Sequence, residues 1–136
     1  MTLKASELKV GDSHSERVVE NLSRTQIVQY AGASGDYNPI HTDEVYTTKV
    51  AGYPSVFAHG MLTMGLTGKM LTNYVGDGRL TRFGVRFTNQ VWPGDSLDAK
   101  ATVTAIKDGL VELEVVTMNQ DGKEVVRGSA EARIDA

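Results

Sequence analysis

The second half of the chain alternates apolar and polar residues in four runs. A period of two residues is typical of β-strands that bury one face against a core. The runs span residues 82–88, 99–105, 111–115 and 126–134. Asp121 and Gly122 stand between the last two runs and predict a hairpin turn. We therefore predict four consecutive strands.

A segment before these strands is apolar on nearly all sides. It spans residues 60–75, and Gly76 follows where the C-terminal cap of a helix belongs. Lys69 within it and His59 just before it argue against a bilayer span. We interpret the segment as a buried central helix. Its methionines, which we expect to fill the core, are Met61, Met64 and Met70.

The simplest way to pack the predicted sheet and helix is against each other. A sheet needs cover on one face, and an apolar helix needs cover on most sides. We therefore expect an α+β domain in which a curved antiparallel sheet wraps around a long central helix.

The N-terminal part of the chain predicts shorter elements. Residues 10–12 form an early turn, and the adjacent valines within residues 15–20 favour a short strand. Ser23 is a suitable N-cap for a helix over residues 25–31, which should end near residues 32–35.

A stiff polar loop outside the core is expected next, over residues 35–41. Pro39 disfavours a helical conformation in the residue before it, so no helix can run through this stretch. Thr42 or Asp43 can then cap a short helix over residues 45–47.

Composition narrows the class of protein. The chain has 136 residues, of which 40% are hydrophobic and 23% charged, and this fits a single domain over residues 1–136. A formal net charge of −3 without a basic stripe argues against nucleic-acid binding. The absence of cysteine excludes disulfides, thiolate nucleophiles and cysteine-based zinc sites. No signal peptide or lipidation motif is recognisable, so we expect a cytoplasmic protein that does not bind membranes.

Asp36 and His41 are candidates for acid–base chemistry. They are five residues apart and can meet only if the chain turns at Asn38 and Pro39. A carboxylate and an imidazole that meet can share one water, so that one group takes its proton while the other delivers a proton elsewhere. A structural interpretation stays open here, with Asp36 in a turn and His41 as a core or surface histidine.

His59 and Gly60 stand at the start of the central helix. Free N–H groups and the positive end of the helix dipole favour a carbonyl oxygen that gathers negative charge. Gly60 permits close approach of a ligand, although a glycine needed only for packing is the alternative. We predict no metal site, because no two ligand residues have the spacing of a metal motif. The residues considered are His14, His41, His59, Asp36, Asp43 and Glu44.

Two motifs resemble those of a known family. They are YAGASGDYNPIHTD at residues 30–43 and FAHGML at residues 57–62. The chain thereby resembles the MaoC-like dehydratases, or (R)-specific enoyl-CoA hydratases, which have the hot-dog fold. The likeness continues through Arg86, Phe87 and residues 91–95 and spans nearly the whole chain. Within that family the chain is most similar to the catalytic subunit of actinobacterial (3R)-hydroxyacyl-thioester dehydratases.

The resemblance implies a role for each motif residue. Asp36 and His41 are the expected catalytic pair that holds the water, and Asn38 shapes their loop. Gly60 is expected to polarise the thioester carbonyl through its backbone N–H. The residues expected to bind substrate are Asn38, Ala58 and His59.

Gly68 departs from the family pattern, because several members carry a serine there. No serine role is therefore expected. Together with Gly65 and Ala58, this glycine can leave room for an acyl chain, although helix packing explains the same small residues equally well.

The resemblance also implies an activity and an assembly. The activity is reversible syn hydration of a trans-2-enoyl thioester of CoA or acyl carrier protein to the (3R)-3-hydroxyacyl thioester, within fatty-acid metabolism and without a cofactor. The alternatives are a non-catalytic acyl-binding partner subunit and a hot-dog acyl thioesterase. A chain of this size cannot easily leave a sheet edge and part of an apolar helix exposed. We therefore expect a homodimer, or a heterodimer with a related hot-dog subunit.

Overall fold

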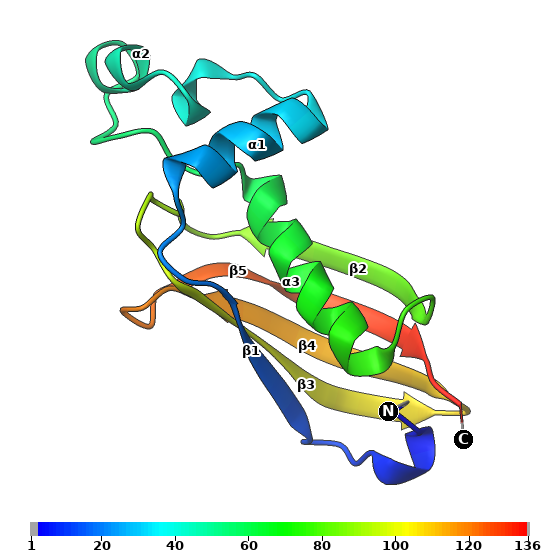
Figure 1. The fold of residues 1–136 in the computed structure, drawn as a ribbon. Helices are drawn as coiled ribbons and strands as arrows, with labels where there is room; N and C mark the ends of the chain where they lie inside the picture. The colour runs from blue at the N-terminus through cyan, green and yellow to red at the C-terminus, as the bar shows by residue number, and fades with distance from the viewer. Residues whose placement is uncertain (1–2, 136) are drawn as a thin grey trace.

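The computed structural model describes residues 3–135. These residues form an α+β fold with five strands (Figure 1). In chain order the elements are the 3-10 helix η1 (Ala5–Glu7), β1 (Ser13–Val19), α1 (Arg24–Ser34), the 3-10 helix η2 (Pro39–His41), α2 (Glu44–Lys49), α3 (Gly60–Val75), β2 (Leu80–Phe87), β3 (Leu97–Lys107), β4 (Leu110–Met118) and β5 (Glu124–Arg133).

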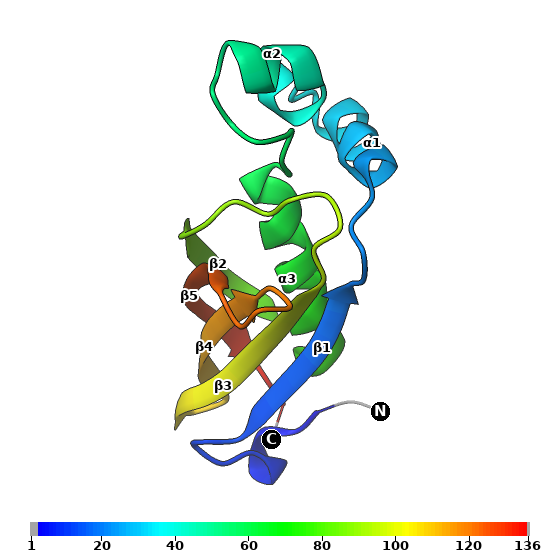
Figure 2. The ribbon, with the colours of Figure 1, turned by 90° about the vertical axis from the view of Figure 1, so that its left-hand side faces the viewer.

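All the strands belong to one antiparallel sheet with the order β1-β3-β4-β5-β2. Strands β3, β4 and β5 follow one another as hairpins. The turn between the last two contains Gly122 at a φ of 74°, a conformation that glycine adopts without strain, and this confirms the turn expected at Asp121 and Gly122. The sheet curves around α3 (Figure 2), as the alternating pattern and the apolar helix predicted.

The core lies between one face of α3 and the inner face of the sheet. The buried residues of α3 are Thr63, Thr67, Met70, Leu71 and Val75. Buried residues of the three central strands packed against this helix include Ala99, Ala101, Val103, Val111, Leu113, Val115, Ala130 and Ala132. Full burial of a side chain such as Leu71 stabilises the fold by roughly 1.5–3 kcal/mol.

The opposite face of α3 is exposed, which corrects one expectation. The sheet covers the helix on one side rather than on most sides, and the exposed residues recur at helical spacing: Met61, Gly65, Lys69 and Asn73. Met70 is fully buried as expected, but Met61 is 55% exposed and does not fill the core of this chain. Met64 is half-buried.

The N-terminal elements begin and end close to where the sequence predicted. Ser23 caps α1 through a complete capping box with Gln26, and Gly35 ends the helix in the left-handed conformation. Asp43, rather than Thr42, caps α2 by accepting a hydrogen bond from the Tyr46 N–H. The helices α1 and α2 lie beyond the sheet, next to the N-terminal end of α3 (Figure 1).

None of the helices within residues 3–135 combines the length and the apolar character that crossing a membrane requires. The curved antiparallel sheet packed on the long helix α3 is the expected hot-dog fold, and the fold prediction is confirmed.

Candidate active site

The loop between α1 and α2 brings Asp36 and His41 together. The Asp36 carboxylate accepts a hydrogen bond from the Asn38 N–H at 3.2 Å, and the Asn38 side chain accepts one from the Ile40 N–H at 3.2 Å. These two local turns lead into η2, which Pro39 begins and His41 ends. The turn that the two residues needed is therefore present, and it contains a 3-10 helix that the sequence did not predict.

His41 is anchored to the segment that precedes α3. Its Nδ1 lies 2.7 Å from the Phe57 carbonyl oxygen, and the Phe57 N–H donates to the Ile40 carbonyl oxygen at 3.3 Å. A carbonyl oxygen only accepts hydrogen bonds, so Nδ1 carries the proton and Nε2 of the neutral ring has a free lone pair. The contact with Phe57 thus selects the tautomer in which Nε2 can act as a base.

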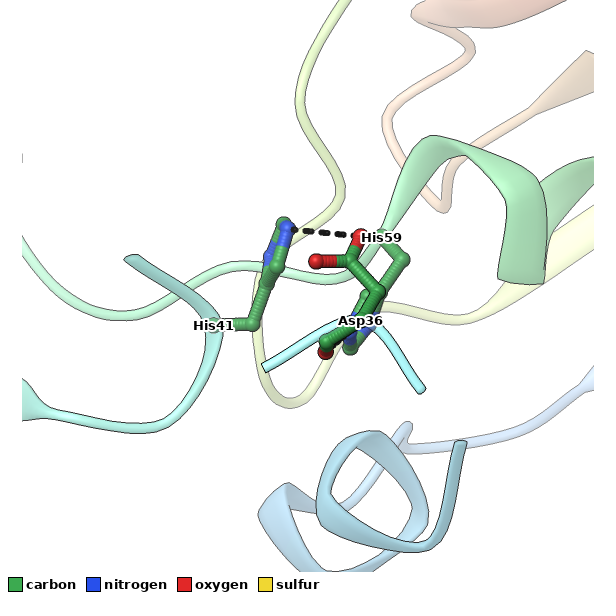
Figure 3. A group of neighbouring side chains, drawn as sticks. All are labelled: Asp36, His41 and His59. Carbon is green, nitrogen blue, oxygen red and sulfur yellow. Dashed lines mark hydrogen bonds and ion pairs between the residues drawn. The ribbon is translucent and has the colours of Figure 1, made fainter. Parts of the chain in front are cut away.

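The free nitrogen of His41 faces the carboxylate of Asp36 (Figure 3). His41 Nε2 lies 3.9 Å from Asp36 Oδ2, and the two side chains are 8% and 51% exposed, respectively. His41 is therefore buried, and the expectation that both residues sit outside the core holds only for Asp36. Burial lowers the pKa of His41 below its usual value of 6.5, the Phe57 hydrogen bond opposes that shift, and the neighbouring His59 adds to it. Burial and His59 therefore both favour the neutral form of the His41 ring, in which Nε2 can accept a proton.

Gly60 is the first residue of α3, and the helix start has no side-chain cap. Its N–H groups are therefore not satisfied by a capping side chain and point out of the helix end. The Ala58 N–H donates to the Val91 carbonyl oxygen at 2.8 Å, which fixes the approach to the helix. A Cβ atom at Gly60 would lie 3.1 Å from the ring of Phe87, so the glycine permits close packing of β2 on the helix start.

A cavity of about 280 Å³ opens beside this helix start. Its lining residues from the start of α3 and the segment before it are Phe57, Ala58, Gly60 and Thr63. Phe87 lies across from them at the end of β2, and Val125 and Val126 of β5 also contribute. Asp36 and His41 do not line this cavity, whereas Phe57 and the two chain neighbours of His59 do. The cavity is large enough for part of an acyl or thioester group.

The three residues expected to bind substrate lie in different surroundings. Asn38 is exposed and caps η2, which fits its expected role in shaping the loop. Ala58 is 5% exposed and lines the cavity. His59 is 2% exposed and its Nε2 lies 3.0 Å from the Asp36 carbonyl oxygen, so its ring is directed at the catalytic loop.

Of the three small residues considered as room for an acyl chain, Ala58 lines the cavity, whereas Gly65 and Gly68 do not. A Cβ atom at Gly68 would lie 3.2 Å from the ring of Phe83, so this glycine serves packing of β2 on the helix. Gly65 has no neighbour within 4 Å in that direction and faces open space. Sequence reasoning missed Phe57 and Phe87 as parts of the cavity wall, because their contacts join segments that are distant in the chain.

Asp36, His41 and His59 also form a cluster whose potential ligand atoms lie within 4.8 Å of one another. Their types match those of metal ligands. Nδ1 of His41 and Nε2 of His59 are hydrogen-bonded to backbone carbonyl oxygens, so these two nitrogens are N–H donors, and the lone pairs that remain are on His41 Nε2 and His59 Nδ1. The arrangement also combines a base, a carboxylate and the free N–H groups of a helix start. Such a set can activate water beside a polarised carbonyl group.

Comparisons with known proteins agree with this architecture. A family model for the MaoC like domain matches residues 6–125. The 3-hydroxyacyl-thioester dehydratase Y of Mycobacterium tuberculosis is 34% identical over 89 residues, which are 63% of this chain and 31% of that protein. The unliganded R-hydratase PhaJ1 of Pseudomonas aeruginosa superimposes with a TM-score of 0.88 at 28% identity, covering 98% of this chain and 86% of that one.

Further similarity shows the fold alone. A chain of the ChsH1-ChsH2 complex of Mycobacterium tuberculosis has a TM-score of 0.81 at 24% identity, covering 93% of this chain and 98% of that one. The chain spans about a third or less of the length of the curated relatives that it matches. The family match nevertheless covers most of the chain. This chain belongs to the MaoC-like dehydratase family and has its hot-dog fold.

Proposed function

We propose that the chain catalyses the reversible hydration of trans-2-enoyl thioesters to (3R)-3-hydroxyacyl thioesters. The observation that carries this proposal is the position of His41 Nε2, which has a free lone pair 3.9 Å from Asp36 Oδ2. A single water within hydrogen-bond distance of both atoms, about 2.8 Å from each, fits this separation. The family membership and the names of the relatives support the same class of reaction.

In the hydration direction, the pair removes a proton from the bound water while the water oxygen bonds to C3 of the enoyl group. The electrons of the C2–C3 double bond move onto the thioester oxygen, where the Gly60 N–H stabilises the negative charge. The proton then passes from the pair to C2, which restores the carbonyl group and returns the pair to its starting state. The overall change adds one water to the double bond. General acid–base catalysis by such a pair contributes about 10²- to 10⁴-fold in rate, and one oxyanion donor contributes about 3–4 kcal/mol.

No cofactor enters this reaction, because the thioester itself makes the proton at C2 acidic. The acyl chain or the pantetheine arm would occupy the cavity beside Gly60, which Phe87 and Val126 line. Within the family, we propose a fatty-acid substrate carried on CoA or acyl carrier protein, as in the 3-hydroxyacyl-thioester dehydratase that the chain resembles.

The test is a spectrophotometric assay with crotonyl-CoA and longer enoyl-CoA substrates. Loss of absorbance from the conjugated double bond measures hydration, and chiral analysis of the product determines its hand. We expect hydration that gives the (3R) product, and we expect an Asp36→Asn variant to lose most of this activity. Formation of the (3S) product would contradict the proposed geometry.

The two alternative functions give different results in the same assay. A thioesterase would release free thiol, which a thiol reagent detects, whereas hydration leaves the thioester intact. A non-catalytic acyl-binding subunit would show neither change, alone or mixed with a related hot-dog subunit. Asp36 and His41 face each other at 3.9 Å, which argues against a non-catalytic acyl-binding subunit.

A further inference from the structure

His59 connects the catalytic loop with the start of α3. Its Nε2 lies 3.0 Å from the backbone carbonyl oxygen of Asp36, and its backbone caps the helix that begins at Gly60. Its ring stacks on the ring of His41, with centroids 3.8 Å apart and planes 23° from parallel. Figure 3 shows the three side chains together. One residue thus touches both members of the proposed catalytic pair.

The hydrogen bond determines the tautomer of His59. A carbonyl oxygen accepts only, so Nε2 carries the proton and the neutral ring has a bare Nδ1. This Nδ1 is buried and has no hydrogen-bond partner within residues 3–135. An unpaired buried nitrogen lowers stability, and an apolar ring of similar size would avoid that cost. The imidazole therefore has a use at this position that packing alone does not explain, and its one polar contact is with the loop that holds Asp36.

Stacking restricts the orientation of His41. The ring of Phe57 meets the His41 ring edge-on at 5.4 Å, while His59 lies parallel to it, and Tyr30 of α1 meets the His59 ring edge-on at 4.8 Å. A 180° flip of the His41 ring about its Cβ–Cγ bond would put Cδ2 in the place of Nδ1 and Cε1 in the place of Nε2, and so would lose the hydrogen bond to the Phe57 carbonyl oxygen. The parallel ring of His59 opposes this flip, because it fills the space through which the His41 ring would turn.

We propose that His59 is a positioning residue for the hydratase reaction and does not bind substrate. It fixes the Asp36 backbone through its Nε2–H and holds the His41 ring with Nε2 directed at the Asp36 carboxylate. This inference rests on the proposed function and replaces the substrate-binding role that the sequence suggested for His59. Its almost complete burial and its orientation toward the loop support the replacement.

Two substitutions separate the two contacts. His59→Phe keeps a ring that can stack on His41 but removes the N–H that Asp36 accepts. His59→Gln removes the ring but can place an amide N–H near the position of Nε2. His14→Phe is the matched control, because His14 also stacks on an aromatic ring, that of Tyr74 at 4.7 Å, and lies on β1 away from the site.

We expect His59→Phe to lower kcat for crotonyl-CoA by about 10- to 100-fold, because a small displacement of a catalytic group costs that much, with KM within about twofold of wild type. His59→Gln should recover part of the loss, and His14→Phe should retain wild-type kcat. The nitrogen-15 spectrum of the His41 ring should show the Nδ1–H tautomer in the wild-type protein. In His59→Gln, which lacks the stacked ring, the spectrum should show a mixture of tautomers.

Three results would overturn the proposal. They are wild-type kcat in a folded His59→Phe protein, a rise in KM with unchanged kcat, which indicates a substrate contact, and an unchanged His41 tautomer in His59→Gln. Failure of the proposed function is a separate result, namely no hydration of any enoyl thioester by the wild-type protein. The His41 tautomer is measured without substrate, so it tests the positioning role in either case.

Discussion

Asp36 and His41 differ in their contact with solvent, and only His41 is buried. The side chain of His41 is 8% exposed and that of Asp36 is 51% exposed. His41 is held by Phe57 and by the stacked ring of His59, whereas Asp36 is held mainly through its own local turn. A base needs a fixed tautomer and a neutral resting state, and buried His41 has both.

Substitution of either residue should remove most of the turnover. We expect Asp36→Asn and His41→Gln each to lower kcat by about 10²- to 10⁴-fold, because each removes a group that binds or activates the water. Asp36→Asn should leave stability nearly unchanged, since the side chain is half exposed. His41→Gln should lower it by about 1–3 kcal/mol, because the buried Phe57 carbonyl oxygen loses its donor. Steady-state kinetics and urea denaturation measure both effects.

The matched controls are Asp77→Asn and His14→Gln. Asp77 is exposed in the turn after α3, and His14 lies on β1. Both controls should keep wild-type kcat. Near-normal rates in folded Asp36→Asn and His41→Gln proteins would reject the catalytic pair.

The pH dependence of the reaction should reflect His41. Burial is the main cause that lowers its pKa below 6.5 in the folded protein, and His59 contributes in the same direction. Since Nε2 acts as a base only when it is unprotonated, kcat/KM should fall with decreasing pH through a midpoint below 6.5. A pH profile of kcat/KM for crotonyl-CoA measures this midpoint. A midpoint above 6.5 for His41, assigned by NMR titration, would contradict the expectation.

The same shift predicts a change in stability with a definite sign. Between the folded pKa of His41 and 6.5, the unfolded chain binds a proton that the folded chain does not. Lowering the pH through this window therefore favours unfolding. We expect the unfolding free energy of wild type to decrease there, and we expect this part of the decrease to be absent in His41→Gln. Urea denaturation at a series of pH values provides the comparison.

At the scale of elements, glycines of α3 allow β2 to pack against the helix. Phe87 lies against Gly60 and Phe83 lies against Gly68, in each case at 3.1–3.2 Å from where a Cβ atom would stand. The two rings are four residues apart on one strand and so point to the same face of it. The packing of β2 therefore sets how closely a substrate can approach the start of α3.

A substitution at Gly60 should reduce activity through this packing. In Gly60→Val the new side chain meets the Phe87 ring and crowds the free N–H groups, so we expect kcat/KM to fall by up to about 10²-fold. Gly65→Ala is the matched control on the same helix, because its Cβ atom meets nothing within 4 Å. The control should keep wild-type kinetics and gain about 0.5–1 kcal/mol of stability, since alanine favours a helix over glycine. A folded Gly60→Val protein with unchanged kinetics would remove the role of Gly60 as an oxyanion donor.

The elements that the sequence predicted correctly are those with a local cause. The capping box of Ser23, the left-handed Gly35 and the alternation of the central strands are each contained in a short stretch of chain. The catalytic loop was also predictable as a turn, because Pro39 restricts its neighbour. Motif resemblance then identified Asp36, His41 and Gly60 as site residues, and the structure brings the first two together.

The parts that the sequence did not predict depend on contacts between distant segments. Phe57 orients His41 across 16 residues, and His59 reaches Asp36 across 23. The sequence predicted Phe83 and Phe87 as strand residues, and Phe87 also as part of the family resemblance, but their packing against Gly68 and Gly60 of α3 exists only once β2 takes its place at the edge of the sheet. The sequence also did not predict that the sheet covers only one side of α3, because the curvature of the folded sheet determines how much of the helix it contacts.

At the scale of the whole molecule, the fold leaves sheet edges unpaired and one face of a helix exposed. The sheet has two open edges, β1 and β2, and α3 has an exposed face that includes Met61. Both edges carry charged residues, since β1 reads SHSERVV and β2 reads LTRFGVRF. They differ in that β2 ends at a large apolar side chain, Phe87, which is 52% exposed. Of the two edges, β2 is therefore the better candidate for pairing with another chain.

We predict that the protein forms a dimer in which two β2 edges pair across a two-fold or pseudo-two-fold axis. This pairing would satisfy the open backbone groups of β2 and would cover Phe87 at the mouth of the cavity, so the catalytic loops would lie near the interface. The partner is a second copy or a related hot-dog subunit, and the isolated chain should still self-associate to cover its edge.

Light scattering at micromolar concentration should therefore give twice the monomer mass of 14.7 kDa. Amide hydrogen exchange should show that protection of β2 falls on dilution while that of β1 does not change, because only amides at the paired edge depend on the partner. A stable, fully active monomer, or concentration-dependent protection confined to β1, would show that β2 is not the interface.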